Sequence, residues 1–470
     1  MGTYKTRLIA TLMSCGVLLT PLPSWACGGC FGLQSSTVSS TVTGHRMAFA
    51  VSEDRTVLWD QFEYSGAPED FSWVLPVLPG AYIEASTDAW FEALETVTQT
   101  QVTSPQLTCA TPDSGCVGFA GASDSSVSTS SPGAFSGGGG VTVLHQGSIG
   151  PYETVTLRST NGDTLSAWLK AHGYGVPPDI EPIIAAYVAE GDDFVAVRLQ
   201  PGRGIQAMTP VRVVTPGGEY LLPLRMVAAG VGESVKIVLY VIGEQRYGMP
   251  DLHEVSVDDS DLIWNFADGS HNYAKLRSDA LAENLGFNYL PTFAFRGAFG
   301  RTLPGSNGSS TNFYRTKTSG FNTLPDLYFA QALEDDAKAV TTCPSITNKL
   351  QGSTLITDGD TGSAASLTCD GYSDISAAMI GMRPANVWLT RLELDLPKEA
   401  LSADCTVVPA DAQEQVSNQR QATRASDRPA GCEEVVFESR MSAHPPTRLT
   451  AWLVLALAGA SLWLRRRGAR

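Results

Sequence analysis

The sequence RMAFAVSEDRTVLWDQFEYSGAPEDFSWVLPV, residues 46–77, keeps one structural pattern over most of its length. Bulky side chains recur at every second position in MAFAV (47–51), and the same spacing returns in FSWVLPV (71–77) after a second extended run at 56–64. A period of two is typical of β-strands, because successive side chains point to opposite faces of a sheet. The stretch therefore predicts a series of strands, separated by polar turns, that bury one face each.

Patterns on both sides of this stretch extend the prediction to the rest of the chain. Helices are expected at 88–97, 163–172, 179–190, 272–285 and 325–340. Further strands are expected at 141–144, 154–157, 194–199, 211–214, 219–227, 234–242 and 388–396. Pro223 lacks the N–H of a ladder residue, so it places 219–227 at an edge or a bulge. Strands outnumber helices without regular alternation, which indicates an α+β fold, predominantly antiparallel β-sheet with a few short helices.

The first 26 residues have the parts of a secretory signal peptide. Lys5 and Arg7 precede an apolar run at 8–22, and small residues stand at the positions that a signal peptidase reads. We expect cleavage after Ala26 and export across the cytoplasmic membrane. The alternative is a lipoprotein signal, in which Cys27 would carry the lipid.

A second apolar run, from Leu449 to Leu464, contains no charge and is flanked by arginines. Its length is near the lower limit of a spanning helix, and the arginines can snorkel to the interface. We expect a single C-terminal transmembrane helix, with the basic tail 465–470 in the cytoplasm and the body outside. Such an end also resembles the sorting tags of Gram-negative bacteria, so removal of the helix and sorting to the cell surface is the alternative.

These patterns divide the chain into six parts. We expect a signal peptide (1–26), a main β-rich domain (27–300) with a flexible Ser/Gly loop (104–140), a second part (301–410) made of an insertion and the strand that completes the sheet, a spacer (411–448), the transmembrane helix (449–464) and the basic tail (465–470).

The charge of the body disfavours one class of partner. Seven of the 32 basic residues and none of the 48 acidic residues lie in the two ends, which leaves 25 basic against 48 acidic residues, or −23. Nucleic-acid binding needs a basic footprint, so no nucleic-acid partner is expected. The predicted partner is the membrane, through the C-terminal helix.

The cysteines point to an oxidising compartment. Cys15 leaves with the signal peptide, and the remaining eight are an even number, which is typical of disulfides in exported proteins. Pairing of neighbours is one hypothesis among many connectivities: Cys27 with Cys30, Cys109 with Cys116, Cys343 with Cys369 and Cys405 with Cys432.

The strongest local motif is Cys27-Gly28-Gly29-Cys30. In a redox protein a helix N-terminus would lower the pKa of the first thiol, but no strand precedes this motif. In a metal site Cys27 would offer a thiolate and, after cleavage, a free amine, with Cys30 in reach. We favour a structural disulfide over both alternatives. If the protein does bind a metal, Cys27 and Cys30 are the candidate ligands. No cofactor is expected.

The remaining polar residues form no recognisable catalytic motif. The histidines show neither metal-ligand spacing nor an H-E-x-x-H motif: His45, His145, His172, His253, His271 and His444. The sequence contains no G-x-S-x-G, P-loop or dinucleotide motif, so no catalytic residue is assigned. The acidic stretches 251–261 and 358–362 lack the ligand spacing of a calcium loop. Trp59, Tyr64 and Trp73 stand at strand spacing and are expected in the core rather than on a ligand surface.

Three segments resemble a bacterial family of unknown function, the domain family numbered 2330. They are CGGCF (27–31), TVLWDQFEYSGAPEDFSWVLPV (56–77) and GSIGPYETVTL (147–157), and the resemblance extends over roughly the first 290 residues. It implies an exported bacterial protein and assigns no reaction. We therefore expect a membrane-anchored envelope protein with a non-enzymatic binding or structural role. A redox or metal-handling protein that uses Cys27 and Cys30 is the first alternative, and an unrecognised hydrolase is the second.

Overall fold

The computed structural model describes residues 41–53, 55–65, 71–109, 140–203, 208–217, 221–228, 231–299, 324, 327–328, 374–379, 381–382, 386–428 and 432–434. Several predicted segments lie outside these residues: the signal peptide, the apolar run 449–464 and most of the helix expected at 325–340. Residues 110–139 and 343–369 also lie outside them. Within the described part of the chain, no helix is long and apolar enough to cross a membrane.

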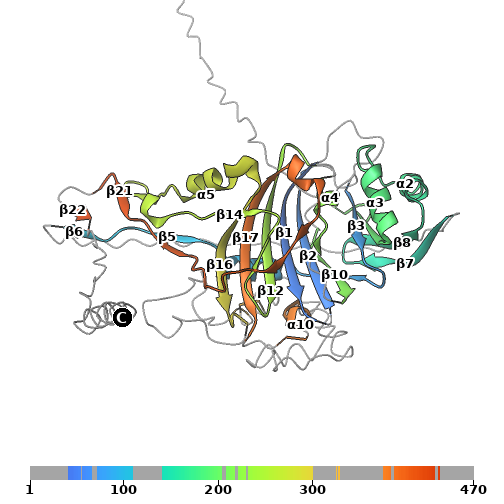
Figure 1. Ribbon diagram of the computed structural model, residues 1–470, viewed down its shortest axis with the longest axis horizontal. Coiled ribbons are helices and arrows are strands. Elements are labelled where there is room, and N and C mark those ends of the chain that lie inside the picture. Colours follow the sequence, from blue (N-terminus) through green and yellow to red (C-terminus); the bar gives the residue numbers. More distant parts are fainter. Residues whose placement is uncertain are drawn as a thin grey trace, which may run out of the picture.

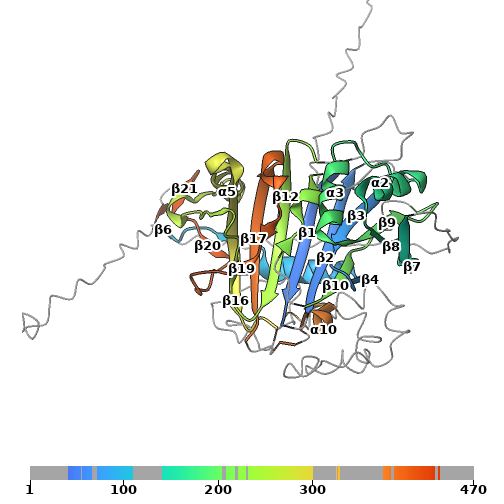
Figure 2. The same cartoon turned by 45° about the vertical axis from the view of Figure 1, so that its right-hand side comes forward.

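An eight-stranded sheet forms the centre of the molecule (Figure 2). Its strands are, in spatial order, β14 (His253–Glu254), β16 (Asn288–Arg296), β17 (Trp388–Pro397), β12 (Ser234–Gly243), β1 (Thr41–Val51), β2 (Arg55–Ser65), β10 (Val211–Pro216) and β4 (Tyr82–Ala85). The pairs β1–β12 and β14–β16 are parallel, and the other neighbours are antiparallel. The strand expected at 388–396 is β17, and it lies inside this sheet.

A second, four-stranded antiparallel sheet packs against the first. Its order is β3 (Ser72–Val77), β9 (Asp193–Leu199), β8 (Tyr152–Ser159) and β7 (Val141–Ile149). The chain passes from one sheet to the other between β2 and β3, within the stretch 46–77. Met47, Phe49 and Trp73 meet in the core between the two sheets. The alternation predicted for this stretch is therefore confirmed.

Both sheets bury their second face as well, which the alternating pattern did not predict. α1 (Asp88–Thr98) and α10 (Asp374–Met379) share a core with Ala48 and Trp59 on the far face of the large sheet. α2 (Gly162–Ala171) and α3 (Glu181–Glu190) share a core with Val74 and Phe194 on the far face of the small sheet (Figure 1). The layers therefore follow the order helix, sheet, sheet, helix. The expected α+β class with mainly antiparallel sheet and few short helices is confirmed for the described chain.

Four of the five helix predictions are confirmed with small changes at their ends, and the fifth, 325–340, lies almost entirely outside the described residues. α1 begins after Thr87 and buries the expected apolar face. α2 is capped by Asn161, whose side chain accepts a hydrogen bond from the backbone N–H of Thr164, rather than by Asp163. α3 ends at Gly191, whose φ of 97° is the left-handed conformation that glycine adopts without strain. α5 (Tyr273–Ala282) continues into a 3₁₀ turn, η4 (Glu283–Gly286).

The strand expected at 219–227 is wrong for residues 224–227, which form a helix. Among the described residues of this range, 221–227, only β11 (Leu221–Leu222) is a strand, and it pairs with β18 (Cys405–Thr406). Pro223 then stands at the N-cap of the short helix α4 (Leu224–Val227). The ladder stops there because proline has no N–H to donate, and the alternating apolar residues are buried by a single helical turn instead.

Residues 411–428 and 432–434, expected to form part of a spacer, pack against the body at one end of the molecule (Figure 1). β20 (Gln419–Gln421) pairs with β5 (Gln101–Thr103), β21 (Arg424–Ser426) with β15 (Ile263–Asn265), and β22 (Cys432–Glu434) with β6 (Leu107–Cys109). Ala422 is buried in a small core with Leu262 and Leu281. The polar composition misled the prediction because three-residue strands at a molecular edge need few apolar side chains. The remaining short elements are β13 (Tyr247–Gly248), β19 (Val408–Pro409), η3 (Asp259–Asp261) and η5 (Lys398–Ser402).

Candidate functional site

An apolar pocket lies between the two sheets. The empty space in and around it is about 540 Å³, which includes open solvent. The lining residues come from β1, β2 and β10 on one side and from β3 and its following turn on the other: Phe49, Thr56, Leu58, Leu75, Pro76, Val77, Leu78, Tyr187, Asp192, Val213, Thr215, Leu221 and Pro223. Two of the polar groups are already engaged, because Thr56 donates to the carbonyl of Gly217 and Tyr187 donates to Asp404.

A narrower pocket adjoins the first and reaches a buried carboxylate. Leu58, Leu75 and Pro223 line both pockets, and Asp60 lines only the narrow one. Asp60 Oδ1 is 2.6 Å from His45 Nδ1, and both side chains are buried. Burial raises the pKa of Asp60, while the neighbouring His45 acts in the opposite direction.

The strand register explains how this pair forms. Asp60 lies opposite Met47 and His45 lies opposite Phe62 on the adjacent strands β1 and β2. Asp60 and His45 are therefore diagonal neighbours on the face that also carries Met47 and Leu58. The sequence contained a signal that we did not use: Asp60 occupies a core-facing position of an alternating strand, where a polar residue needs a partner.

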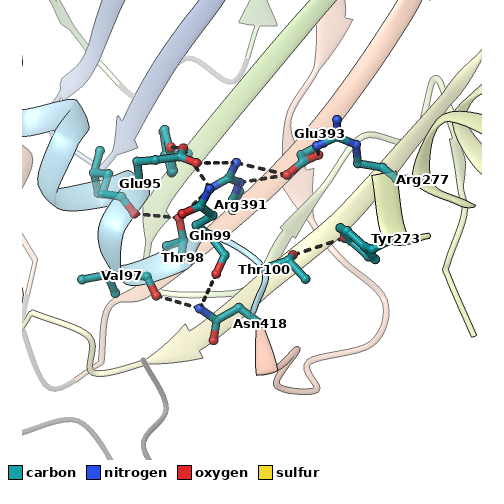
Figure 3. Close-up of polar contacts among 12 residues, drawn as sticks. Glu95, Val97, Thr98, Gln99, Thr100, Tyr273, Arg277, Arg391, Glu393 and Asn418 are labelled. Atoms are coloured by element: carbon teal, nitrogen blue, oxygen red, sulfur yellow. Dashed lines mark hydrogen bonds and ion pairs between the residues drawn. The ribbon is translucent and has the colours of Figure 1, made fainter. Parts of the chain in front are cut away.

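An ion-pair network covers the other face of the large sheet beside α1. Figure 3 shows the guanidinium of Arg391 between the carboxylates of Glu95 and Glu393. Arg391 Nη1 is 2.9 Å from Glu95 Oε2, and Arg277 Nη1 is 3.0 Å from Glu393 Oε2. Two positive and two negative charges therefore balance one another. Burial lowers the pKa of Arg391, but Tyr240, Glu393 and Glu95 outweigh it and raise this pKa above its ordinary value.

A second buried network surrounds Asp374 at the start of α10. Its Oδ1 accepts hydrogen bonds from Trp59 Nε1 at 2.8 Å, from Ser86 Oγ at 2.9 Å and from Arg212 Nη1 at 3.0 Å. Its Oδ2 accepts one from the hydroxyl of Tyr328 at 3.0 Å. The side chains of Arg212 and Asp374 have no exposed surface. These hydrogen bonds satisfy the buried carboxylate and hold the surrounding elements together.

These two networks serve the packing of the fold. Each contains carboxylates that are satisfied by arginines and hydroxyl groups of the same network, and neither lies in the wall of the pocket. Among the described residues, no group of three or more His, Cys, Asp or Glu side chains is arranged to hold a metal ion. The arrangement supports binding of an apolar group between the sheets more directly than it supports a reaction.

The predicted site residues are scattered or lie outside the described chain. Cys27, Cys30, Cys116, Cys343 and Cys369 lie outside it, together with His444 and the acidic stretch 358–362. Trp59 and Trp73 are in the core, as expected. His172 caps the end of α2, where its Nδ1 is 2.7 Å from the carbonyl oxygen of Trp168 and its ring stacks on that indole.

The predicted pairing of Cys405 with Cys432 is wrong. Cys405 is a buried free thiol in β18, beside the strand that contains Leu222. Cys432 is disulfide-bonded, and in the register of β22 and β6 it stands opposite Cys109. Neighbouring positions in the sequence were a poor guide, because sheet pairing brings the end of the described chain next to residue 109.

The fold and the pocket define a four-layer α+β protein with an apolar cleft between its sheets. The chain belongs to the family DUF2330, described as "Uncharacterized protein conserved in bacteria", whose family model matches residues 23–277. This match confirms the resemblance carried by CGGCF and the segments 56–77 and 147–157. No curated protein and no solved structure matches the chain.

Proposed function

We propose that the chain is an exported, membrane-anchored protein of the bacterial cell envelope with a non-enzymatic binding task, and that the pocket between the sheets is its ligand site. The observation that carries this proposal is a contrast between two kinds of environment. The charged side chains around Arg391 and Asp374 are satisfied within the layers, whereas the pocket walls are mostly apolar. Ligand sites in proteins typically combine such walls with a few polar groups.

The chemistry of the pocket selects an apolar ligand group. Phe49, Leu58 and Val213 face Leu75 and Val77 across it, and each can contribute buried apolar surface on binding. The lining residues include no Lys, Arg or His side chain, so an anionic group would have to leave water without a counter-charge there, which costs several kcal/mol by order of magnitude. The ligand class is therefore an uncharged hydrophobic group, such as the end of an acyl chain.

Two sequence features support the envelope location. The apolar run at 8–22 with its cleavage positions favours export, and the run 449–464 with its arginines favours a single anchor. Protease treatment of whole cells and of osmotically opened cells, followed by detection of the body and of a tag after Arg470, measures this topology. A body digested only outside the cytoplasmic membrane and a protected tag are expected. A body found in the cytoplasm would contradict the proposal.

The pocket is tested by filling it with a larger side chain. We expect Leu221→Trp, at a lining residue, to occupy part of the pocket, and Leu144→Trp, on the exposed strand β7, is the matched control. The protein is purified in an amphipathic polymer, and bound apolar molecules are extracted and quantified by mass spectrometry. Wild type and Leu144→Trp should retain the same molecule, and Leu221→Trp should lose it by roughly tenfold, or about 1.4 kcal/mol. Equal retention by all three proteins would remove the pocket as the ligand site.

A further inference from the structure

The end of the described chain forms a strap across the body, defined here as residues 416–428 and 432–434. Val416 exchanges two backbone hydrogen bonds of 2.9 Å with Ala294. The Asn418 side chain donates to the carbonyl oxygens of Val97 and Gln99, at 2.9 and 3.0 Å, at the C-terminal end of α1 (Figure 3). The strap then runs along β5, β15 and β6 in turn. It therefore joins segments that are far apart in the sequence.

Most individual contacts beyond Asn418 are weak. The three strand pairings of the strap involve three residues each. Arg420 lies 2.7 Å from Asp259 and Arg424 lies 3.2 Å from Asp261, but these pairs are partly or largely exposed. Exposed ion pairs contribute little, and short ladders at an edge open easily. A strap held in this way would peel from its C-terminal end unless that end were fastened.

The strand register places two cysteines opposite each other at that end. In the antiparallel pair of β22 and β6, Cys432 stands opposite Cys109 and Glu434 stands opposite Leu107. Opposite residues of such a pair have Cα atoms about 4.5–5.5 Å apart, which is within the range that a disulfide spans. Cys432 is disulfide-bonded.

We propose that Cys109 and Cys432 form a disulfide that locks the strap to the body at the point from which the chain leads to the predicted anchor. In this step the S–S bond replaces two S–H bonds. The two thiols give up two protons and two electrons to a disulfide oxidant of the cell envelope, which is thereby reduced to a dithiol. The inference rests on the proposed function for its oxidising compartment.

The bond changes how the body is connected to the membrane. Without it, a pull on the C-terminal segment would open β22, β21 and β20 one after another, each with only a few hydrogen bonds. With it, the same pull acts on a covalent link to β6, and the strap stays in place. The peptide bonds after Arg420 and Arg424 of the strap would then also be protected from proteases, because cleavage requires local opening.

The test maps the bond and measures its effect on the full chain. Protein isolated from the envelope is alkylated without reduction, digested and analysed by mass spectrometry. A linked peptide pair that contains Cys109 and Cys432 is expected. Trypsin should cut the strap at Arg420 and Arg424 at least roughly tenfold faster in Cys432→Ser than in wild type. Cys116→Ser is the matched control, and it should leave both the linked pair and the cleavage rate unchanged.

The outcomes separate this inference from the proposed export. A Cys109–Cys116 link, or free Cys109 and Cys432 in a protein whose other cysteines are oxidised, overturns the bond while export stands. If all cysteines are reduced in cells, the envelope location fails. Refolding in a glutathione redox buffer then still tests the pairing: a Cys109–Cys432 link supports it and any other link to Cys432 overturns it. Equal cleavage of wild type and Cys432→Ser removes the locking role.

Discussion

Trp59 in β2 donates its indole N–H to Asp374 Oδ1 at 2.8 Å, although the two residues are 315 positions apart in the chain. The same oxygen accepts a hydrogen bond from Arg212 of β10. Asp374 therefore joins α10 to two strands of the large sheet. It is one of the described points at which the second half of the sequence is fastened to the helix-covered face of that sheet.

Replacing Asp374 by Asn should destabilise the protein by about 3–5 kcal/mol, because it leaves the buried Arg212 without its fully buried counter-charge. Urea denaturation followed by tryptophan fluorescence measures the change in the free energy of unfolding. Glu84→Gln is the matched control, since Glu84 binds the same arginine but is partly exposed. Its loss should be clearly smaller. An unchanged unfolding midpoint for Asp374→Asn would show that the network does not stabilise the fold.

Arg391→Met should also cost about 3–5 kcal/mol, because Glu95 and Glu393 would lose their shared buried cation. Arg277→Met tests the outer end of the same network, where the arginine side chain is 38% exposed. We expect a loss below about 1 kcal/mol there. Comparable losses in the two variants would contradict the view that burial decides the energy of this network. Chemical denaturation of both variants provides the comparison.

The ion pair between Glu190 and Arg225 should make stability fall in acid. The hydrogen bonds from Arg225 lower the pKa of Glu190 below its ordinary value of 4.5. The unfolded state then binds the proton more readily, so this contribution is present above pH 4.5 and disappears as the pH falls through the lowered pKa. Half of the Glu190 side chain is exposed, which limits the effect to less than about 1 kcal/mol. Glu190→Gln should flatten this part of a stability-against-pH curve, and an unaltered curve would refute the assignment.

The Cys405 thiol should react only after unfolding. Burial, followed by the nearby Asp251 and Asp404, raises its pKa to about 12, so the reactive thiolate is scarce at neutral pH. Iodoacetamide should label Cys405 in urea-unfolded protein and leave it unlabelled in the native protein, as measured by peptide mass spectrometry. Rapid labelling of the native protein would show that the pair β11–β18 opens readily.

Gly162 is required by the close contact of α2 and α3. A Cβ added at this position would lie 2.5 Å from the backbone Cα of Ala185, so the two helices would have to separate. We expect Gly162→Ala to cost about 1–3 kcal/mol, the usual range for overpacking. Gly232→Ala is the control, because nothing lies within 4 Å of a Cβ added there. Thermal unfolding of both variants measures the loss. If Gly162→Ala lowered the melting temperature no more than Gly232→Ala does, the close contact of the two helices would be contradicted.

Local patterns in the sequence determined much of the secondary structure. The two-residue alternation of MAFAV and FSWVLPV was enough to predict β1 and β3, and the caps before α1 and after α3 were recognisable from Thr87 and Gly191. These signals are local because side-chain direction and backbone conformation repeat within a few residues. Pro223 was also noticed, but whether the chain after it continues as strand or turns into α4 depends on the cores around it.

Only the tertiary structure decided which segments meet. The alternation does not say that β1 and β3 belong to different sheets, that Asp60 finds His45, or that residue 432 returns to residue 109. Nor does it show that Arg391 and Glu393, on the polar side of an alternating strand, are buried under α1. Such contacts follow from how layers pack and how strands pair over long sequence distances, and these energies are not expressed in the periodicity of any single segment.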